Sequence, residues 1–111
     1  MLKKDLIESE AIKVKPSKRY IAKNTKSVKV LEEFSNDWDY DVRCGVANNM
    51  NCSVEVFEKL SKDSNYYVRC GVAWNKNCPV EILEKLSNNQ DDVIVQCYAS
   101  KNLDRIRSAK S

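Results

Sequence analysis

Five cysteines are the side chains of this chain best suited to chemistry, because a thiolate can act as a nucleophile, exchange disulfides or bind a metal. Cys44, Cys70 and Cys97 recur in similar surroundings, as do Cys52 and Cys78. No two cysteines have the Cys-x-x-Cys spacing, and the chain contains no histidine. A zinc site, a redox motif and a histidine-based triad are therefore not expected. We interpret the five thiols as reduced, small apolar groups of the core.

Asp37, Asp39 and Asp41 are a second candidate cluster, since alternating aspartates can supply calcium ligands. The string lacks the glycine and the distant glutamate of an EF-hand loop. In the next copy of the same sequence, Asp63 and Asn65 take the places of Asp37 and Asp39. Capping of the following helix is the better interpretation. We predict no catalytic, cofactor-binding or metal-binding residue, and no enzymatic activity.

An internal sequence repeat indicates which secondary-structure elements carry these residues. The segment VRCGVANNMNCSVEVFEKLS begins at Val42 and returns as VRCGVAWNKNCPVEILEKLS at Val68, 26 residues later. Fainter copies flank the pair, with SVKVLEEFS at Ser27 and VQCYASKN at Val95. Repeats this short become stable only by stacking on their neighbours. The sequence therefore predicts an all-α solenoid of stacked two-helix repeats, about 26 residues each.

The first helix of a repeat is indicated by Val42, Val46 and Ala47, whose spacing puts them on one inward stripe. Gly45 lies on this helix, where glycine costs about 1 kcal/mol relative to alanine. We attribute its repetition at Gly71 to close helix packing. Asn49 follows the stripe where a left-handed residue would end the helix.

The second helix begins near Ser53 and carries its predicted buried face at every third residue. Those residues are Val54, Phe57 and Leu60 in one copy, and Val80, Leu83 and Leu86 in the next.

The repeated string resembles the leucine-rich repeat variant, a short all-helical repeat related in style to HEAT and armadillo arrays. The family pattern reads V-R-x-x-V-A-x-N-P-N-T-P-x-x-x-L-x-x-L-A-x-D, and the match covers residues 17–102. The resemblance implies a curved, right-handed solenoid and little about activity. The chain departs from the pattern at Met50 and Lys76, at Cys52 and Cys78, and at Gln96. One member carries an iron–sulfur cluster on a cysteine-rich segment before its repeats, but residues 1–43 here contain no cysteine.

We predict a single domain over residues 1–111, with an N-terminal cap at 1–16, repeats at 17–102 and a C-terminal cap or tail at 103–111. No apolar run approaches the length of a membrane span, and the lysines after Met1 precede no apolar run of a secretory signal. An odd number of cysteines without such a signal favours the reducing cytoplasm.

Charge divides unevenly along the chain. Residues 1–29 hold nine Lys or Arg against three acids, a net of +6, whereas residues 30–111 hold ten against thirteen, a net of −3. A basic end on an acidic body suggests contact with an anionic partner. The candidate nucleic-acid contacts are Lys18, Arg19, Lys23 and Lys26.

Aromatic residues supply a different kind of candidate surface. Trp74 replaces Asn48 of the preceding copy and Lys101 of the following one, so it is expected to be exposed. Exposed tryptophan is a common interface anchor. The predicted partner-binding residues are Trp74, Trp38 and Tyr66 with Arg43 and Arg69, although these arginines could instead pair with Asp39 and Asn65 within the fold.

These observations favour a cytoplasmic, non-enzymatic protein-binding or scaffold module, either a monomer or a weak homodimer. The alternative is a nucleic-acid-binding module that uses the basic N-terminal third.

Overall fold

The computed structural model describes residues 16–89 and 92–110, which form seven helices and no strand. The all-α prediction is therefore confirmed for this part of the chain. The predicted N-terminal cap lies almost wholly outside it. The helices are α2 Lys18–Asn24, α3 Val28–Phe34, α4 Tyr40–Ala47, α5 Val54–Ser61, α6 Tyr66–Trp74, α7 Val80–Ser87 and α8 Val93–Lys110.

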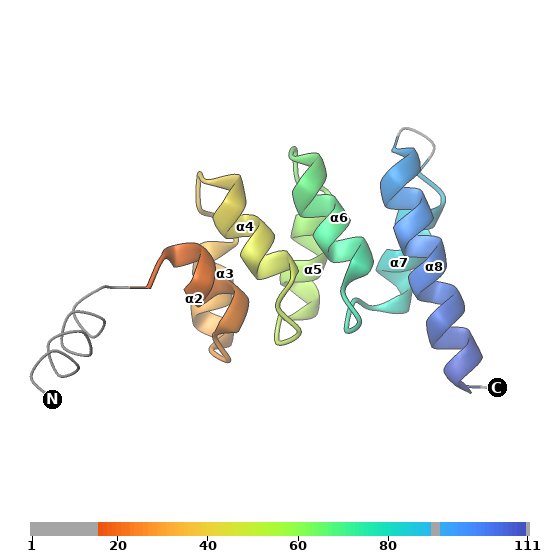
Figure 1. The fold of residues 1–111 in the computed structure, drawn as a ribbon, viewed down its shortest axis with the longest axis horizontal. Helices are drawn as coiled ribbons and strands as arrows, with labels where there is room; N and C mark the ends of the chain where they lie inside the picture. Colours follow the sequence, from red (N-terminus) through yellow and green to blue (C-terminus); the bar gives the residue numbers. More distant parts are fainter. Residues whose placement is uncertain (1–15, 90–91, 111) are drawn as a thin grey trace, which may run out of the picture.

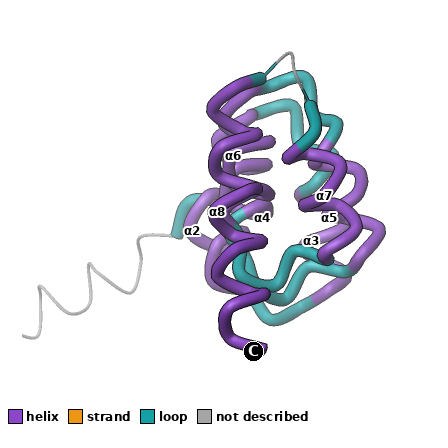
Figure 2. Tube along the Cα trace, turned by 90° about the vertical axis from the view of Figure 1, so that its right-hand side faces the viewer, coloured by secondary structure: helices purple, strands orange, loops and turns teal. Residues whose placement is uncertain are grey.

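The helices lie in two layers (Figures 1 and 2). One layer holds α2, α4, α6 and α8, each in contact with the next. The other holds α3, α5 and α7, which pack against the first layer. Because the chain alternates between the layers, equivalent positions of successive copies come to lie side by side.

Glycine allows α2, α4 and α6 to approach one another closely. A Cβ on Gly45 would lie 2.9 Å from the carbonyl oxygen of Arg19, and a Cβ on Gly71 would lie 2.9 Å from the Cβ of Ala47. Both distances are well short of the roughly 3.5–4.0 Å at which carbon atoms pack. The packing role predicted for these glycines is confirmed.

The buried face of the second helices differs from the prediction at its first position. Val54 is 57% exposed and Val80 is only half-buried, whereas Val56 and Ile82 are buried beside Phe57, Leu60, Leu83 and Leu86. At about 100° per residue, positions 56, 57 and 60 fall within one arc of about 100°, but position 54 lies about 120° from position 60. Helices α5 and α7 are therefore rotated from the predicted orientation.

Asparagine side chains join successive copies through the core. Asn49, Asn75 and Asn102 are all buried, and no residue in the described ranges has a positive φ. The prediction that Asn49 ends its helix in a left-handed conformation is therefore wrong. Instead its side-chain amide donates a hydrogen bond of 2.9 Å to the carbonyl oxygen of Ala22 and one of 2.7 Å to that of Thr25.

The same bonds repeat at the next two copies, so we call Asn49, Asn75 and Asn102 the asparagine ladder. Asn75 donates to the carbonyls of Ala47 and Asn49, and Asn102 to those of Ala73 and Asn75. The last carbonyls of a helix have no partner within it. Each asparagine thus satisfies the helix end of the copy before it.

Candidate functional site

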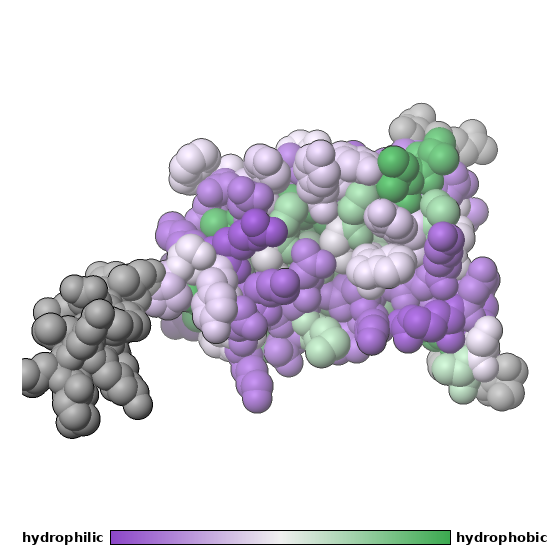
Figure 3. All heavy atoms as spheres, viewed as in Figure 1, coloured by the Kyte–Doolittle hydropathy of each residue, from purple (hydrophilic) through white to green (hydrophobic). Residues whose placement is uncertain are grey.

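A groove of about 510 Å³ crosses the layer of α2, α4, α6 and α8. We call it the aromatic groove, because Tyr40, Tyr67, Trp74 and Tyr98 line it. Arg19 of α2 and Asp41 of α4 are its charged lining residues. Figure 3 shows this face, with pale and green side chains over the upper part of α4, α6 and α8 and more hydrophilic ones below.

The aromatic rings pack in two pairs. The ring centroids of Trp74 and Tyr98 lie 5.2 Å apart, and those of Tyr40 and Tyr67 lie 6.3 Å apart in a stacked arrangement. Both separations are within the range in which aromatic pairs attract one another. Even so, Trp74 remains 58% exposed and Tyr67 61% exposed. The pairs hold the rings in place and leave apolar surface for a ligand.

Substitutions between the copies explain where these rings gather. Trp74 occupies the place of Asn48 on α4, and Tyr98 occupies the place of Gly71 on α6. The side chain of Tyr98 therefore packs against Trp74 of α6. At the equivalent position of the preceding copy, Gly71 has no side chain and lets α6 approach α4 closely. The repeat supplies the scaffold, and departures from it supply the groove.

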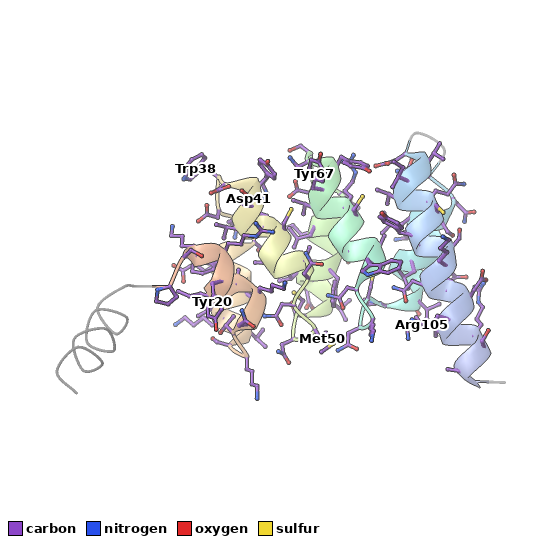
Figure 4. The ribbon with its side chains drawn as sticks, in the orientation of Figure 1. Tyr20, Trp38, Asp41, Met50, Tyr67 and Arg105 are labelled. Atoms are coloured by element: carbon purple, nitrogen blue, oxygen red, sulfur yellow. The ribbon has the colours of Figure 1, made fainter. Side chains whose placement is uncertain are left out.

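A smaller hollow of about 140 Å³ adjoins the groove at Trp74. Its charged lining residues are Lys76, Lys101 and Arg105, all exposed. We call these three side chains the basic cluster. In Figure 4, Arg105 lies toward the lower end of α8, opposite the end at which Asp41 and Tyr67 lie on their helices. The cations therefore mark one end of the groove.

The asparagine ladder also holds part of the basic cluster. The side-chain oxygens of Asn49 and Asn75 accept from the backbone amides of Asn51 and Asn77. At Asn102 the helix continues, and the corresponding oxygen accepts instead from the guanidinium of Arg105 at 2.8 Å. This bond fixes the cation beside Trp74.

The sequence-predicted partner residues are only partly brought together. Trp74 lies in the groove, and Tyr66 is half-buried with its ring packed edgewise against Tyr67, 5.1 Å between centroids. A hydrogen bond with Cys70 raises the pKa of Tyr66 to about 12. Trp38, 89% exposed, lies on the loop before α4 and lines a different hollow beside Lys18 (Figure 4).

Arg43 and Arg69 lie in ion pairs with the following copy, and not with Asp39 or Asn65. Arg43 Nε donates a hydrogen bond of 2.9 Å to the carboxylate of Asp63, and the guanidinium of Arg69 donates one of 3.0 Å to the carboxylate of Asp92. The hydrogen bond with Asp63 raises the pKa of Arg43. Only 15% and 22% of these two arginine side chains remain exposed, so their visible role is to join neighbouring copies.

The predicted nucleic-acid residues occupy different surroundings. Lys18 is paired with Asp37 at 3.1 Å, and Arg19 belongs to the aromatic groove. Lys23 and Lys26 are exposed at the far end of α2 and on the loop after it. The structure therefore does not gather the four cations into one patch.

The aspartate string caps a helix, as predicted. Asp39 is the N-cap of α4 and accepts from the amide of Asp41, while Asp37 accepts from the amide of Asp39. This amide and the Lys18 ammonium lower the pKa of Asp37 from 3.8. Within residues 16–89 and 92–110, no three acidic or thiol side chains are grouped to hold a metal.

The cysteines are free, but they are not equally buried. Cys44 and Cys78 are buried, Cys52 and Cys70 are half-buried, and Cys97 is exposed. The prediction of a core thiol is therefore wrong for Cys97, which lies on α8, where no described helix packs beyond it. Burial raises the pKa of Cys52 and of Cys78 to about 12.

Sequence reasoning missed the basic cluster. Lys76 follows Trp74 by two residues, and Lys101 is the repeat equivalent of that tryptophan, so their proximity was available from the repeat alignment. Arg105 lies beyond residue 102, where the repeat pattern ends, and only the continuation of α8 places it beside Trp74.

Comparisons with protein-family models, with curated protein sequences and with solved structures find no match. None of the helices described is both long and apolar enough to cross a bilayer.

Proposed function

We propose that this chain is a non-enzymatic protein-binding module, built as a short right-handed solenoid of two-helix repeats of the leucine-rich repeat variant kind. Helices α4 and α6 begin 26 residues apart, as do α5 and α7. The asparagine ladder and the arginine ion pairs recur with the same repeat, which supports the solenoid.

Trp74 is the observation that carries the proposal. It combines an exposed fraction of 58% with a packed position against Tyr98, inside a groove lined by two further tyrosines. Aromatic side chains that are already held in place lose little conformational entropy on binding, and they dominate the energetics of protein interfaces. The groove therefore suits a segment of a protein partner.

The thiols of the groove support binding over catalysis. Burial raises the pKa of both Cys44 and Cys70, which line the groove. A catalytic cysteine needs the opposite shift, because the thiolate is the reactive form. Five free thiols also suit the reducing cytoplasm, where we place the protein.

The second candidate is a nucleic-acid-binding module, favoured by the exposure of Lys23 on the last turn of α2, Lys26 on the following loop and Lys29 at the start of α3. Phosphate contacts of this kind need no aromatic groove. The two functions therefore depend on different side chains, and variants can separate them.

The test is affinity purification from the native host followed by quantitative mass spectrometry, with and without nuclease. Three folded baits are compared: the natural sequence, Trp74→Ala, and Lys23→Gln with Lys26→Gln and Lys29→Gln. We expect a protein that survives nuclease treatment, is recovered with the lysine variant and is lost with Trp74→Ala. Recovery that depends on nucleic acid and on the lysines, but not on Trp74, would support the second candidate.

A further inference from the structure

The distribution of charge around Trp74 points to the chemistry of the partner, on the basis of the protein-binding function proposed above. The aromatic groove and the adjoining hollow are lined by four cations and one carboxylate. These are Arg19, Lys76, Lys101 and Arg105 against Asp41, a net of +3. Residues 30–111, which supply all but Arg19, carry a net charge of −3. The positive charge at the groove is therefore a local concentration and does not follow from the overall composition.

The basic cluster has the arrangement of a carboxylate-binding site. Among the described residues, Lys76 and Lys101 form no ion pair, and Arg105 is held by the neutral oxygen of Asn102. By contrast, Lys18, Arg43 and Arg69 each have an aspartate partner within the fold. The cations of the cluster are thus left for an external anion, and Arg105 is already oriented for it.

We propose that the groove binds an acidic segment of a partner protein, in which a bulky apolar side chain packs on Trp74 and Tyr98. The neighbouring Asp or Glu side chains then meet Lys76, Lys101 and Arg105. The part of the groove from α4 to α8 crosses three adjacent helices about 8–10 Å apart and therefore spans roughly 20 Å. An extended chain at about 3.3 Å per residue crosses that distance in about six residues.

Asp41 favours an acidic peptide over a nucleic acid. It lines the end of the groove away from the basic cluster (Figure 4). Arg19 lines the same two hollows as Asp41, so the charges at this end offset each other, and the phosphates of a single strand lying along the groove would be attracted only at the basic cluster. A peptide can instead carry its acidic residues only at the cationic end.

The experiment is a selection of displayed random peptides of about eight residues on the immobilised full chain, with Trp74→Ala as the counter-selection target. We expect the Trp74-dependent peptides to contain a bulky apolar residue flanked by Asp or Glu. The best of them should bind at least tenfold more weakly to Lys76→Gln/Lys101→Gln, and unchanged to Lys59→Gln/Lys85→Gln. These control lysines are exposed on α5 and α7 in the opposite layer.

The outcomes separate the two proposals. Trp74-dependent peptides without acidic enrichment, or with enrichment in Lys and Arg, would overturn the acidic partner and leave the protein-binding function standing. Absence of any Trp74-dependent peptide would overturn both. Tighter binding of labelled oligothymidylate than of any selected peptide, lost with Trp74→Ala, would replace the acidic peptide with a nucleic acid. Circular dichroism of each variant checks that it is folded.

Discussion

The side-chain amide of Asn75 donates a 2.8 Å hydrogen bond to the carbonyl oxygen of Ala47, the last residue of α4. A second bond, of 3.0 Å, reaches the carbonyl of Asn49. The buried side chain of Asn75, the C-cap residue of α6, thus completes the end of α4, and the same relationship recurs at Asn49 and Asn102. The carbonyl of Ala47 therefore gains this partner only when the next copy is packed against α4.

Asn75→Ala should destabilise the protein by about 2–4 kcal/mol, because two buried carbonyls lose their partner. Asn77→Ala is the matched control, since its amide makes one exposed bond to the carbonyl of Met50. We expect the control to cost at most about 1 kcal/mol. Urea unfolding at neutral pH measures both. Equal losses of unfolding free energy in the two variants would show that the buried bonds of the asparagine ladder contribute no more to stability than an exposed bond.

Gly71→Ala should lower the free energy of unfolding by about 1–3 kcal/mol, as overpacked positions do. The added methyl group would meet the Cβ of Ala47 at 2.9 Å. This cost opposes the helix propensity of alanine, which favours it over glycine by about 1 kcal/mol. Adding Ala47→Gly removes the opposing Cβ. The double variant should therefore melt at a higher temperature than Gly71→Ala alone. If Gly71→Ala alone melts at a higher temperature than the natural chain, that result would contradict the close approach of α4 and α6.

Leu60→Ala should cost about 2–5 kcal/mol, the usual cost of truncating a buried leucine. Val54→Ala on the same helix should be near neutral, because Val54 is 57% exposed and Leu60 fully buried. Chemical denaturation of the pair tests how α5 is rotated. Similar losses of stability at both positions would show that Val54 is buried together with Leu60, as the sequence spacing predicted.

Asp37 should make stability depend on acid pH. Its pKa is lowered in the folded chain by the amide of Asp39 and by Lys18, so its ionised form stabilises the fold above pH 3.8. That contribution disappears as the pH falls from 3.8 through the lowered pKa. Asp37→Asn should therefore be less stable than the natural chain at neutral pH, with a difference that shrinks in acid. A difference independent of pH would show that the charge is not responsible.

The repeat made much of the architecture predictable. Apolar spacing around Val42 and Val68 indicated buried stripes on the first helices, and both residues are buried in α4 and α6. The glycines on those helices indicated close packing, which the short approach at Gly71 bears out. These features are local or repeat along the chain, so a single sequence can reveal them.

The remaining features depend on contacts between copies. A buried asparagine after an apolar stripe has the same sequence appearance as a helix-ending asparagine, and only the neighbouring carbonyls distinguish Asn49 from one. The pairing of Arg43 with Asp63 crosses 20 residues of sequence, while the closer Asp39 serves as a helix cap. Exposure of Trp74 was predictable from its polar counterparts, but the hollow that it lines together with Arg105 was not.

Photo-crosslinking in living cells tests the protein-binding groove most directly. Benzoylphenylalanine is placed at Tyr67 in the groove, at Glu58 on α5, or at Lys26 after α2. We expect a protein adduct of discrete mass from position 67, lost when Trp74→Ala is added, and none from positions 58 and 26. An adduct from position 58 or 26 with none from position 67, or a nuclease-sensitive adduct from position 26, would contradict the groove as the binding site.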